Sequence, residues 1–276
     1  MGELIGVVNS PRLSSRTVFS LPNYDDVTRE RRSLLRAHDY EAAPPADWWK
    51  PDQRKGVSPP PLEKPYGSDA RLLELVDPGD FSIGNTPLIE TIANRESRRT
   101  FKEDPLTLEE LSFLLWATQG VRAIDENNVW TKRTVPSGGG RQPYETYLLV
   151  NRVDEIERGL YRYLPIEHKL LPVSEGLPSA DELMDKAWFQ NFIGKSAVVF
   201  VWAAIPYKTE WRYSIMSYKD ILIEAGHICQ NLYLACEAIG AGTCAIAAYD
   251  QKTMDRLLRI DGINEITVYM APVGKV

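Results

Sequence analysis

The chain has 276 residues, 43% of them hydrophobic and 25% charged, which is typical of a globular protein that can bury a sizeable core. Its 32 basic and 38 acidic residues leave a net charge of −6, which argues against nucleic acid or an anionic membrane as the main ligand. A small anionic cofactor is compatible with this charge, because a few arginines suffice to hold it.

The cysteines and the apolar runs indicate a cytoplasmic protein. Cys229, Cys236 and Cys244 are odd in number and unclustered, which favours reduced thiols over a disulfide framework or a zinc site. The N-terminus lacks the basic and apolar segments of a signal peptide. The longest apolar runs, such as 197–206, are too short to cross a bilayer, so we expect no membrane partner.

Residues 1–85 are rich in proline and aromatic residues and show little periodicity, for example at Pro44-Pro45, Trp48-Trp49 and Pro59-Pro60-Pro61. This pattern predicts an extended arm, with a short helix around 25–38. A plain linker is the alternative. We prefer an arm that packs on the body or on a partner subunit, since disordered tails rarely hold so many aromatic residues.

From residue 86 to 276 the pattern predicts a single α+β domain. The best-marked helix covers 107–118, where Thr107 and Glu110 form a capping box and Gly120 follows the end. The other predicted helices are 86–94, 179–191, 218–239 and 250–259, the last capped by Asp250. The predicted strands are 145–150, 160–163, 197–204 and 265–271.

The first candidate binding motif follows the helix 86–94. Arg95, Ser97 and Arg99 alternate, so an extended backbone would place their side chains on one side. Two guanidinium groups and a hydroxyl match the acceptors of a phosphate. A solvated basic stretch is the alternative interpretation.

The second candidate motif is the run 134–143, which contains Pro136-Ser137-Gly138-Gly139-Gly140 directly before a predicted strand. Three glycines without Cβ atoms let the backbone lie close to a flat ligand and present N–H groups to it. It is not a nucleotide P-loop, because no Lys-Ser/Thr follows, and the chain has no Gly-x-Gly-x-x-Gly fingerprint. A flexible turn before a strand is the alternative.

The helix 218–239 is apolar almost all round, which predicts burial in a core or in a dimer interface. Gly226 costs about 1 kcal/mol there relative to alanine, so we expect it to permit close packing. Glu224 and His227 have the spacing of a di-iron ligand pair. We predict no metal, because no second such pair exists, and interpret His227 as a core histidine. The small-residue run 240–250 that follows suits a backbone pressed against a planar ring.

In this order the motifs resemble the nitroreductase superfamily. The resemblance covers about 86–276 and rests on Arg-x-Ser-x-Arg-x-Phe, Pro-Ser-Gly-Gly-Gly-Arg-x-Pro and a terminal Pro-Val-Gly. Within the superfamily, Glu-Ala-Gly-His-x-x-Gln-Asn-Leu-Tyr-Leu at 224–234 is similar to the SagB-type dehydrogenases, relatives of the thiazole/oxazole-forming oxidases.

The resemblance implies a mixed sheet flanked by helices, assembled as an intertwined homodimer with FMN at the interface. It implies that Arg95, Ser97 and Arg99 hold the FMN phosphate, with Lys275 at a position where a basic residue often reaches it. It also implies that a turn from the other subunit and a loop line the ring. Their residues are Pro136, Ser137, Gly138, Gly139, Ala245, Ile246, Ala247 and Ala248.

One departure concerns proton transfer. Azoline-oxidising relatives use a Lys-Tyr pair upstream of the Gly-His helix, and the nearest match here is Arg212-Tyr213. Arginine stays protonated in proteins and is therefore a poor base. Tyr213 or Lys219 would have to assist, and azoline oxidation is disfavoured.

The resemblance thus implies an FMN-dependent oxidoreductase that passes hydride through flavin N5, to or from a small organic or peptide-azoline substrate. NAD(P)H or another partner would alternate with the substrate in one slot over the ring, giving ping-pong kinetics. The alternatives are a non-catalytic flavin-binding subunit that scaffolds a peptide-modifying complex and a family member that has lost FMN.

Overall fold

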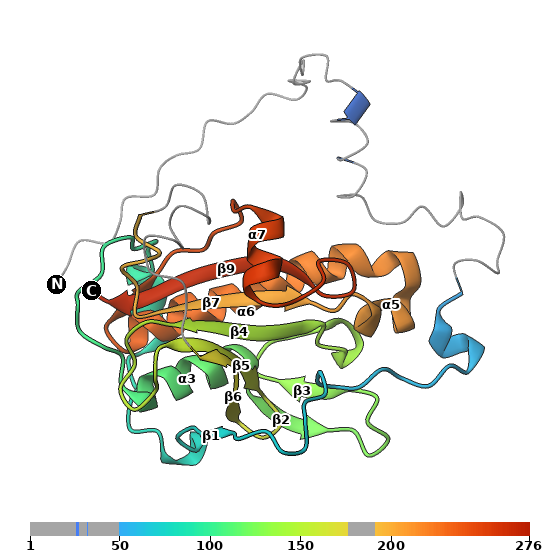
Figure 1. Ribbon diagram of the computed structural model, residues 1–276, viewed down its shortest axis with the longest axis horizontal. Helices are drawn as coiled ribbons and strands as arrows, with labels where there is room; N and C mark the ends of the chain where they lie inside the picture. The colour runs from blue at the N-terminus through green and yellow to red at the C-terminus, as the bar shows by residue number, and fades with distance from the viewer. Residues whose placement is uncertain (1–25, 28–31, 33–49, 176–190) are drawn as a thin grey trace. The chain divides into compact units, whose positions relative to one another are not determined.

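The computed structural model describes residues 26–27, 32, 50–175 and 191–276 (Figure 1). The chain divides into two compact units, Met1–His38 and Asp39–Val276. In the first unit Asp26, Val27 and Arg32 are helical, and the rest of the predicted helix 25–38 lies outside the described residues. The tryptophans at 48–49 and the predicted helix 179–191, except Asn191, also lie outside them.

The second unit is built on a seven-stranded sheet with the strand order β1-β6-β5-β4-β7-β9-β8. Every strand pair in this sheet is antiparallel, so the prediction of a mixed sheet was wrong for the described strands. Strands β4, β5 and β6 follow one another through short connections, which antiparallel pairing allows, whereas β1, β7 and β9 pair with strands distant in the sequence. The strands are β1 Leu73–Glu74, β4 Tyr144–Val150, β5 Gly159–Leu164, β6 Lys169–Glu175, β7 Val198–Ala204, β8 Ala241–Thr243 and β9 Ile266–Lys275.

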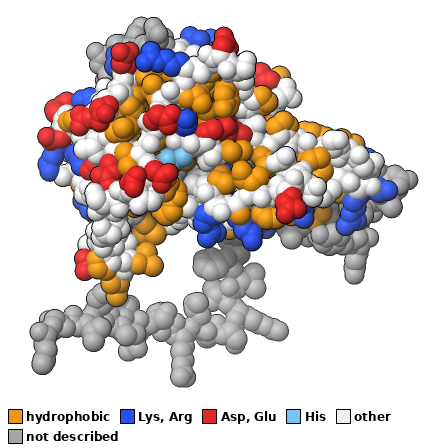
Figure 2. All heavy atoms as spheres, turned by 90° about the horizontal axis from the view of Figure 1, so that it is seen from below, with side chains coloured by type: hydrophobic (Ala, Val, Ile, Leu, Met, Phe, Trp, Pro, Cys, Tyr) orange, Lys and Arg blue, Asp and Glu red, His pale blue; other side chains and the backbone are white. Residues whose placement is uncertain are grey.

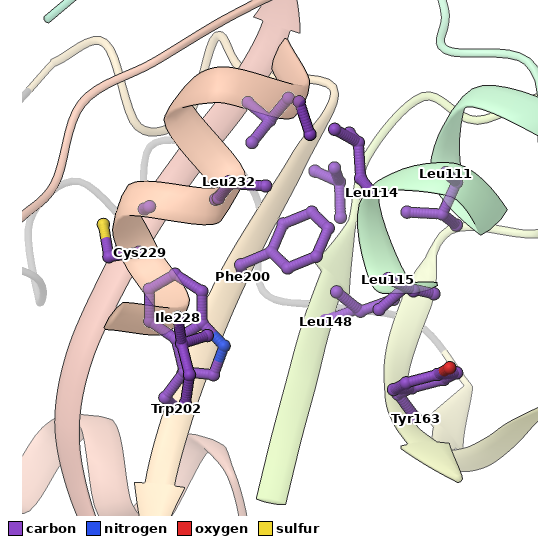
Figure 3. Close-up of a cluster of buried hydrophobic side chains, with 14 of the residues drawn as sticks. Leu111, Leu114, Leu115, Leu148, Tyr163, Phe200, Trp202, Ile228, Cys229 and Leu232 are labelled. Atoms are coloured by element: carbon purple, nitrogen blue, oxygen red, sulfur yellow. The ribbon is translucent and has the colours of Figure 1, made fainter. Parts of the chain in front are cut away.

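Helices cover both faces of the sheet, and this explains why every residue of the central strands β4 and β7 is buried (Figure 1). Helices α3 Leu108–Gln119 and α6 Ser217–Ala238 pack on one face. Figure 3 shows Phe200 of β7 among Leu114 of α3 and Leu232 of α6. Helix α7 Gln251–Leu257 packs on the other face through Met254.

Most predicted elements are confirmed. The predicted capping box of α3 is present, Asp250 caps α7, and the predicted helix 86–94 is α2 Leu88–Asn94. The predictions missed the hairpin of β2 Val121–Ile124 and β3 Thr131–Arg133, as well as α5 Tyr207–Tyr213 and the strands β1, β6 and β8. No described helix is long and apolar enough to cross a membrane. The face in Figure 2 carries hydrophobic side chains gathered between charged ones.

Part of the predicted arm packs on the sheet and its helices. Strand β1 pairs with β6 at the sheet edge, and the Phe81 ring lies edge-on to Phe113 at 5.7 Å. The Trp211 indole donates to the Val57 carbonyl at 2.9 Å. The arm residues named here, from Val57 to Phe81, therefore belong to the compact unit that begins at Asp39.

A buried ion pair lies beneath this segment. Lys208 of α5 and Glu145 of β4 are 2.6 Å apart, with only 3% and 2% of their side chains exposed. Lys208 also donates to the Leu62 carbonyl at 3.2 Å, and Glu145 accepts the Lys64 N–H at 3.1 Å. Burial opposes the charge of Glu145, but Lys208 and Arg162 outweigh it and hold the pKa of this carboxyl below its usual value.

Candidate functional site

The glycine run forms a tight turn against α5. Residues Gly138–Gly140 make one turn of 3-10 helix, with Gly139 at φ 59° and Gly140 at φ 66°. Glycine suits this left-handed region. A Cβ on Gly139 would lie 2.5 Å from Arg212 Nε and 2.7 Å from the Tyr213 hydroxyl. The structure therefore brings the predicted ring-contacting turn together with the Arg212-Tyr213 pair.

Arg141 fixes the end of this turn. Its side chain is fully buried and donates to the carbonyls of Lys208, at 2.8 Å, and Pro60, at 3.1 Å. Its guanidinium also stacks on the Trp211 ring, 4.9 Å from the centroid. Burial, with a smaller contribution from Arg212, lowers the pKa of Arg141 to about 10. One buried arginine thus contacts both the arm and α5 at the end of the turn. The sequence interpretation gave Arg141 no role.

Glu224 holds the other end of the turn, a role that the sequence interpretation missed. This buried side chain of α6 accepts the Gly138 N–H at 2.7 Å. Burial raises the pKa of Glu224 to about 7, although hydrogen bonds from Gly138 and Ser137 oppose the shift. His227 is exposed, so its interpretation as a core histidine was wrong. The described residues contain no cluster of three metal-ligating side chains.

Glu224→Gln should flatten the pH dependence of stability. The folded pKa of Glu224 lies above its unfolded value of 4.5, so its contribution is fully present below pH 4.5 and is lost as pH rises through about 7. The loss is on the order of 3 kcal/mol. We expect the difference in unfolding free energy between pH 5 and pH 8, measured with urea, to shrink in this variant but not in Glu90→Gln, which alters an exposed side chain. Equal pH dependence in both variants would contradict the assignment.

Two residues of the predicted phosphate motif gather at Tyr233 of α6. The Arg95 guanidinium lies 5.4 Å from the ring centroid, and the hydroxyls of Ser97 and Tyr233 are 2.9 Å apart. The Tyr233 hydroxyl also accepts the Ala245 N–H at 2.8 Å. Tyr233 therefore connects the phosphate motif to the small-residue run. The sequence interpretation missed it because its position widens the apolar stripe of the helix.

Arg99 is placed apart from this group. It is exposed and lines a cavity of about 670 Å³ together with Phe101, Phe192 and Lys195. Neither Arg95 nor Ser97 lines this cavity. Ser97 pairs with Thr243 of β8, and Arg98 donates its N–H to the Thr243 carbonyl at 2.9 Å. This pairing fixes the path of the backbone through the motif. Of the three side chains expected on one side, only Arg95 and Ser97 contact the same residue, Tyr233.

The remaining predicted site residues do not gather at one point of the described chain. Lys275 at the end of β9 forms an ion pair with Glu110 of α3. Ile246 is buried and exchanges backbone hydrogen bonds with Met270. The other predicted contacts include exposed residues, namely Ala247, Ala248, Pro136 and Lys219.

The two halves of the candidate site lie on opposite flanks of α6. Glu224 contacts the glycine turn and Tyr233 contacts the phosphate motif. They are nine residues apart, which is two and a half helical turns and about 14 Å along the axis. Their side chains therefore point in opposite directions about the helix. In one chain the glycine turn and the phosphate motif cannot close around the same small ligand without passing α6.

The donors present suit a flavin mononucleotide. A guanidinium and a hydroxyl at Arg95 and Ser97 match a phosphate, while backbone without Cβ atoms at 138–140 can lie against a planar ring. The space that a Cβ on Gly139 would fill is occupied by Arg212 and Tyr213, so this glycine lets the turn pack closely against α5.

Comparisons with known proteins agree with these features. The family model of the nitroreductase family matches residues 92–275. The chain is 32% identical over 193 residues to a protein of Methanocaldococcus jannaschii named "Putative nitroreductase MJ1384", covering 70% of this chain and 93% of that protein.

Solved structures share the fold. The crystal structure of a "putative nitroreductase" from Ralstonia eutropha matches with a TM-score of 0.63 at 24% identity, covering 80% of this chain and 94% of that one. The E. coli microcin synthetase McbBCD complex with truncated pro-MccB17 bound matches with a TM-score of 0.55 at 20% identity, covering 91% and 92%. The chain belongs to the nitroreductase family and is an FMN-dependent oxidoreductase of that family.

Proposed function

We propose that this chain forms a homodimer, binds FMN at the dimer interface, and transfers hydride between NAD(P)H and a small organic acceptor. The observation that supports a site formed by both subunits is the placement of the glycine turn and the phosphate motif on opposite flanks of α6. A twofold axis beside α6 would bring the phosphate motif of one chain to the glycine turn of the other.

The outer face of α6 supports such an interface. Leu222 and Ile223 are exposed there, and a Cβ on Gly226 would meet no described atom within 4 Å. Glycine in mid-helix costs about 1 kcal/mol relative to alanine, and nothing in the described chain explains that cost. Close approach of a second chain would explain it. The nearby helix α2 also exposes apolar side chains, at Leu88, Ile89 and Ile92.

The proposed roles follow from the contacts. Arg95 and Ser97 would hold the phosphate, supplemented by Arg99 and Lys275 if those side chains turn toward it. Pro136 to Gly139 would line the ring from the partner subunit, and Ala245 to Ala248 would present N–H groups to it. FMN, when bound, supplies hydride transfer at N5. Arg212, which lies against Gly139, would stabilise negative charge on the ring, and Tyr213 beside it would deliver a proton.

A peptide substrate is the second candidate, and one comparison favours it. The microcin synthetase complex shares the fold over most of both chains and holds a truncated pro-peptide. Arg212, however, stays protonated and cannot remove a proton from an azoline. We therefore favour reduction of a nitro, quinone or enone acceptor over azoline oxidation.

Spectroscopy tests the proposed function. The purified protein should show the absorption bands of oxidised flavin, NADH or NADPH should bleach them under anaerobic conditions, and an added quinone or nitroaromatic compound should restore them. A protein that takes up no FMN when reconstituted would overturn the proposal. Bound flavin that no nicotinamide bleaches would instead favour the scaffold subunit.

A further inference from the structure

A second cavity of about 340 Å³ lies between the glycine turn and the β2–β3 hairpin. The turn contributes Pro136, Ser137 and Gly139 to its wall, and the hairpin side contributes Arg122, Trp130 and Lys132. The same turn residues that would contact the flavin ring therefore also border this cavity. A molecule bound here would lie beside the proposed reaction site.

The cavity lining also includes Arg133, a buried arginine that forms no close ion pair among the described residues. Its side chain is only 3% exposed. The guanidinium donates to Gln119 Oε1 at 2.8 Å and to Thr131 Oγ1 at 3.4 Å, and no carboxylate of the described residues lies within 4 Å of it. Burial lowers the pKa of Arg133, yet arginine stays charged in proteins. Glu145, Glu63 and Glu224 favour this charge from a longer distance but offset the effect of burial only in part, so an anion in the cavity would stabilise it further.

The other groups of the cavity match such a ligand. Lys132 is exposed and its ammonium lies 5.5 Å from the centre of the Trp130 ring. Arg122 is exposed and donates to the Arg133 carbonyl at 3.2 Å, which ties the two strands together beside the cavity. The lining includes no aspartate or glutamate. Three cations and an indole ring suit a flat molecule with a negative group.

We propose that this cavity binds the anionic group, a carboxylate or a phosphate, of the substrate that reacts at the flavin. Lys132 on the exposed side of β3 provides the charge that contacts the anion, Arg133 on the buried side adds positive charge at longer range, and the Trp130 ring provides a flat apolar surface. This inference rests on the proposed function. The anion comes either from a carboxylate-bearing acceptor or from the phosphates of the nicotinamide donor, and both sources have the same chemistry.

Lys132→Gln tests the inference because the altered side chain is exposed and spares the fold. We expect the KM for 4-nitrobenzoate to rise roughly tenfold, as for loss of one charge-assisted hydrogen bond, with the KM for neutral 4-nitrobenzamide unchanged. A similar rise for NADPH, with 4-nitrobenzoate unaffected, would identify the donor as the source of the anion. Unchanged values for both anions would overturn the inference. Lys252→Gln, on the exposed side of α7, is the matched control.

A binding measurement separates this inference from the proposed function. Equilibrium dialysis of 4-nitrobenzoate and NADPH against the oxidised protein needs no turnover. Binding of either anion that weakens in Lys132→Gln supports the cavity even if no nicotinamide bleaches the flavin. Equal binding by the wild-type protein and the variant contradicts it even if the flavin chemistry is confirmed. The flavin content of both proteins should be the same.

Discussion

Lys208→Met is expected to lower the free energy of unfolding by about 3–5 kcal/mol. The substitution removes the ammonium that lies 2.6 Å from Glu145 and leaves that carboxylate buried without its partner. Methionine preserves most of the side-chain volume, so the loss reports charge and not a cavity. Urea denaturation followed by circular dichroism measures the effect.

Two controls show whether the loss comes from burial of the pair. Lys208→Met combined with Glu145→Gln should lose less than Lys208→Met alone, because the glutamine is neutral and still accepts the Lys64 N–H. Lys55→Met removes an exposed ion pair with Asp52, at 3.0 Å, and should change stability by less than about 1 kcal/mol. A Lys208→Met protein as stable as Lys55→Met would show that Glu145 finds another partner.

The double variant Arg95→Ala, Arg99→Ala should purify without FMN while remaining a dimer. Loss of charge-assisted hydrogen bonds to a phosphate should weaken FMN binding roughly a hundredfold or more. Because Arg95 lies beside Ser97 and Tyr233 and Arg99 lines another cavity, Arg95→Ala alone should account for most of the loss. Arg256→Ala, at an exposed position of α7, is the control. Full flavin content in the double variant would show that the phosphate binds elsewhere.

Mixing two defective chains tests the shared site. Gly139→Val should also lose flavin, because the new side chain would clash with Arg212 and strain a backbone at φ 59°. A hybrid of one Arg95→Ala chain and one Gly139→Val chain has one site with both halves intact. Refolding the two variants together should therefore restore flavin to one of the two sites of each hybrid. No recovery would mean that each flavin is held by a single chain.

Much of the fold could be predicted from the sequence because its signals are local. The capping box at Thr107 and Glu110 and the cap at Asp250 mark helix starts through contacts three residues apart. The hairpin β2–β3 was missed because its strands have only four and three residues and because β3, Thr131-Lys132-Arg133, is entirely polar. Strand direction also depends on tertiary pairing, so the antiparallel order could not be derived from periodicity.

The site could be predicted as segments but not as contacts. Sequence patterns identified Arg95, Ser97 and the glycine turn as candidate ligand contacts. They did not identify Glu224 or Tyr233 as the partners of these segments, because both belong to a helix whose apolar stripe suggests a core. Nor did they separate Arg99 from Arg95, since alternation holds only while the backbone stays extended. Long-range pairing, here with Thr243, decided that difference.

Hydrogen bonds from the arm connect it to residues that lie behind the glycine turn. Carbonyl oxygens of Val57, Pro60 and Leu62 accept from the indole of Trp211, the guanidinium of Arg141 and the ammonium of Lys208. A chain shortened to the family match at 92–275 would remove these three acceptors, although Lys208 would keep Glu145 and Arg141 would keep the Lys208 carbonyl. Residues that precede the family match thus help to hold Arg141 and α5 behind the glycine turn, so activity assays should include residues 50–91.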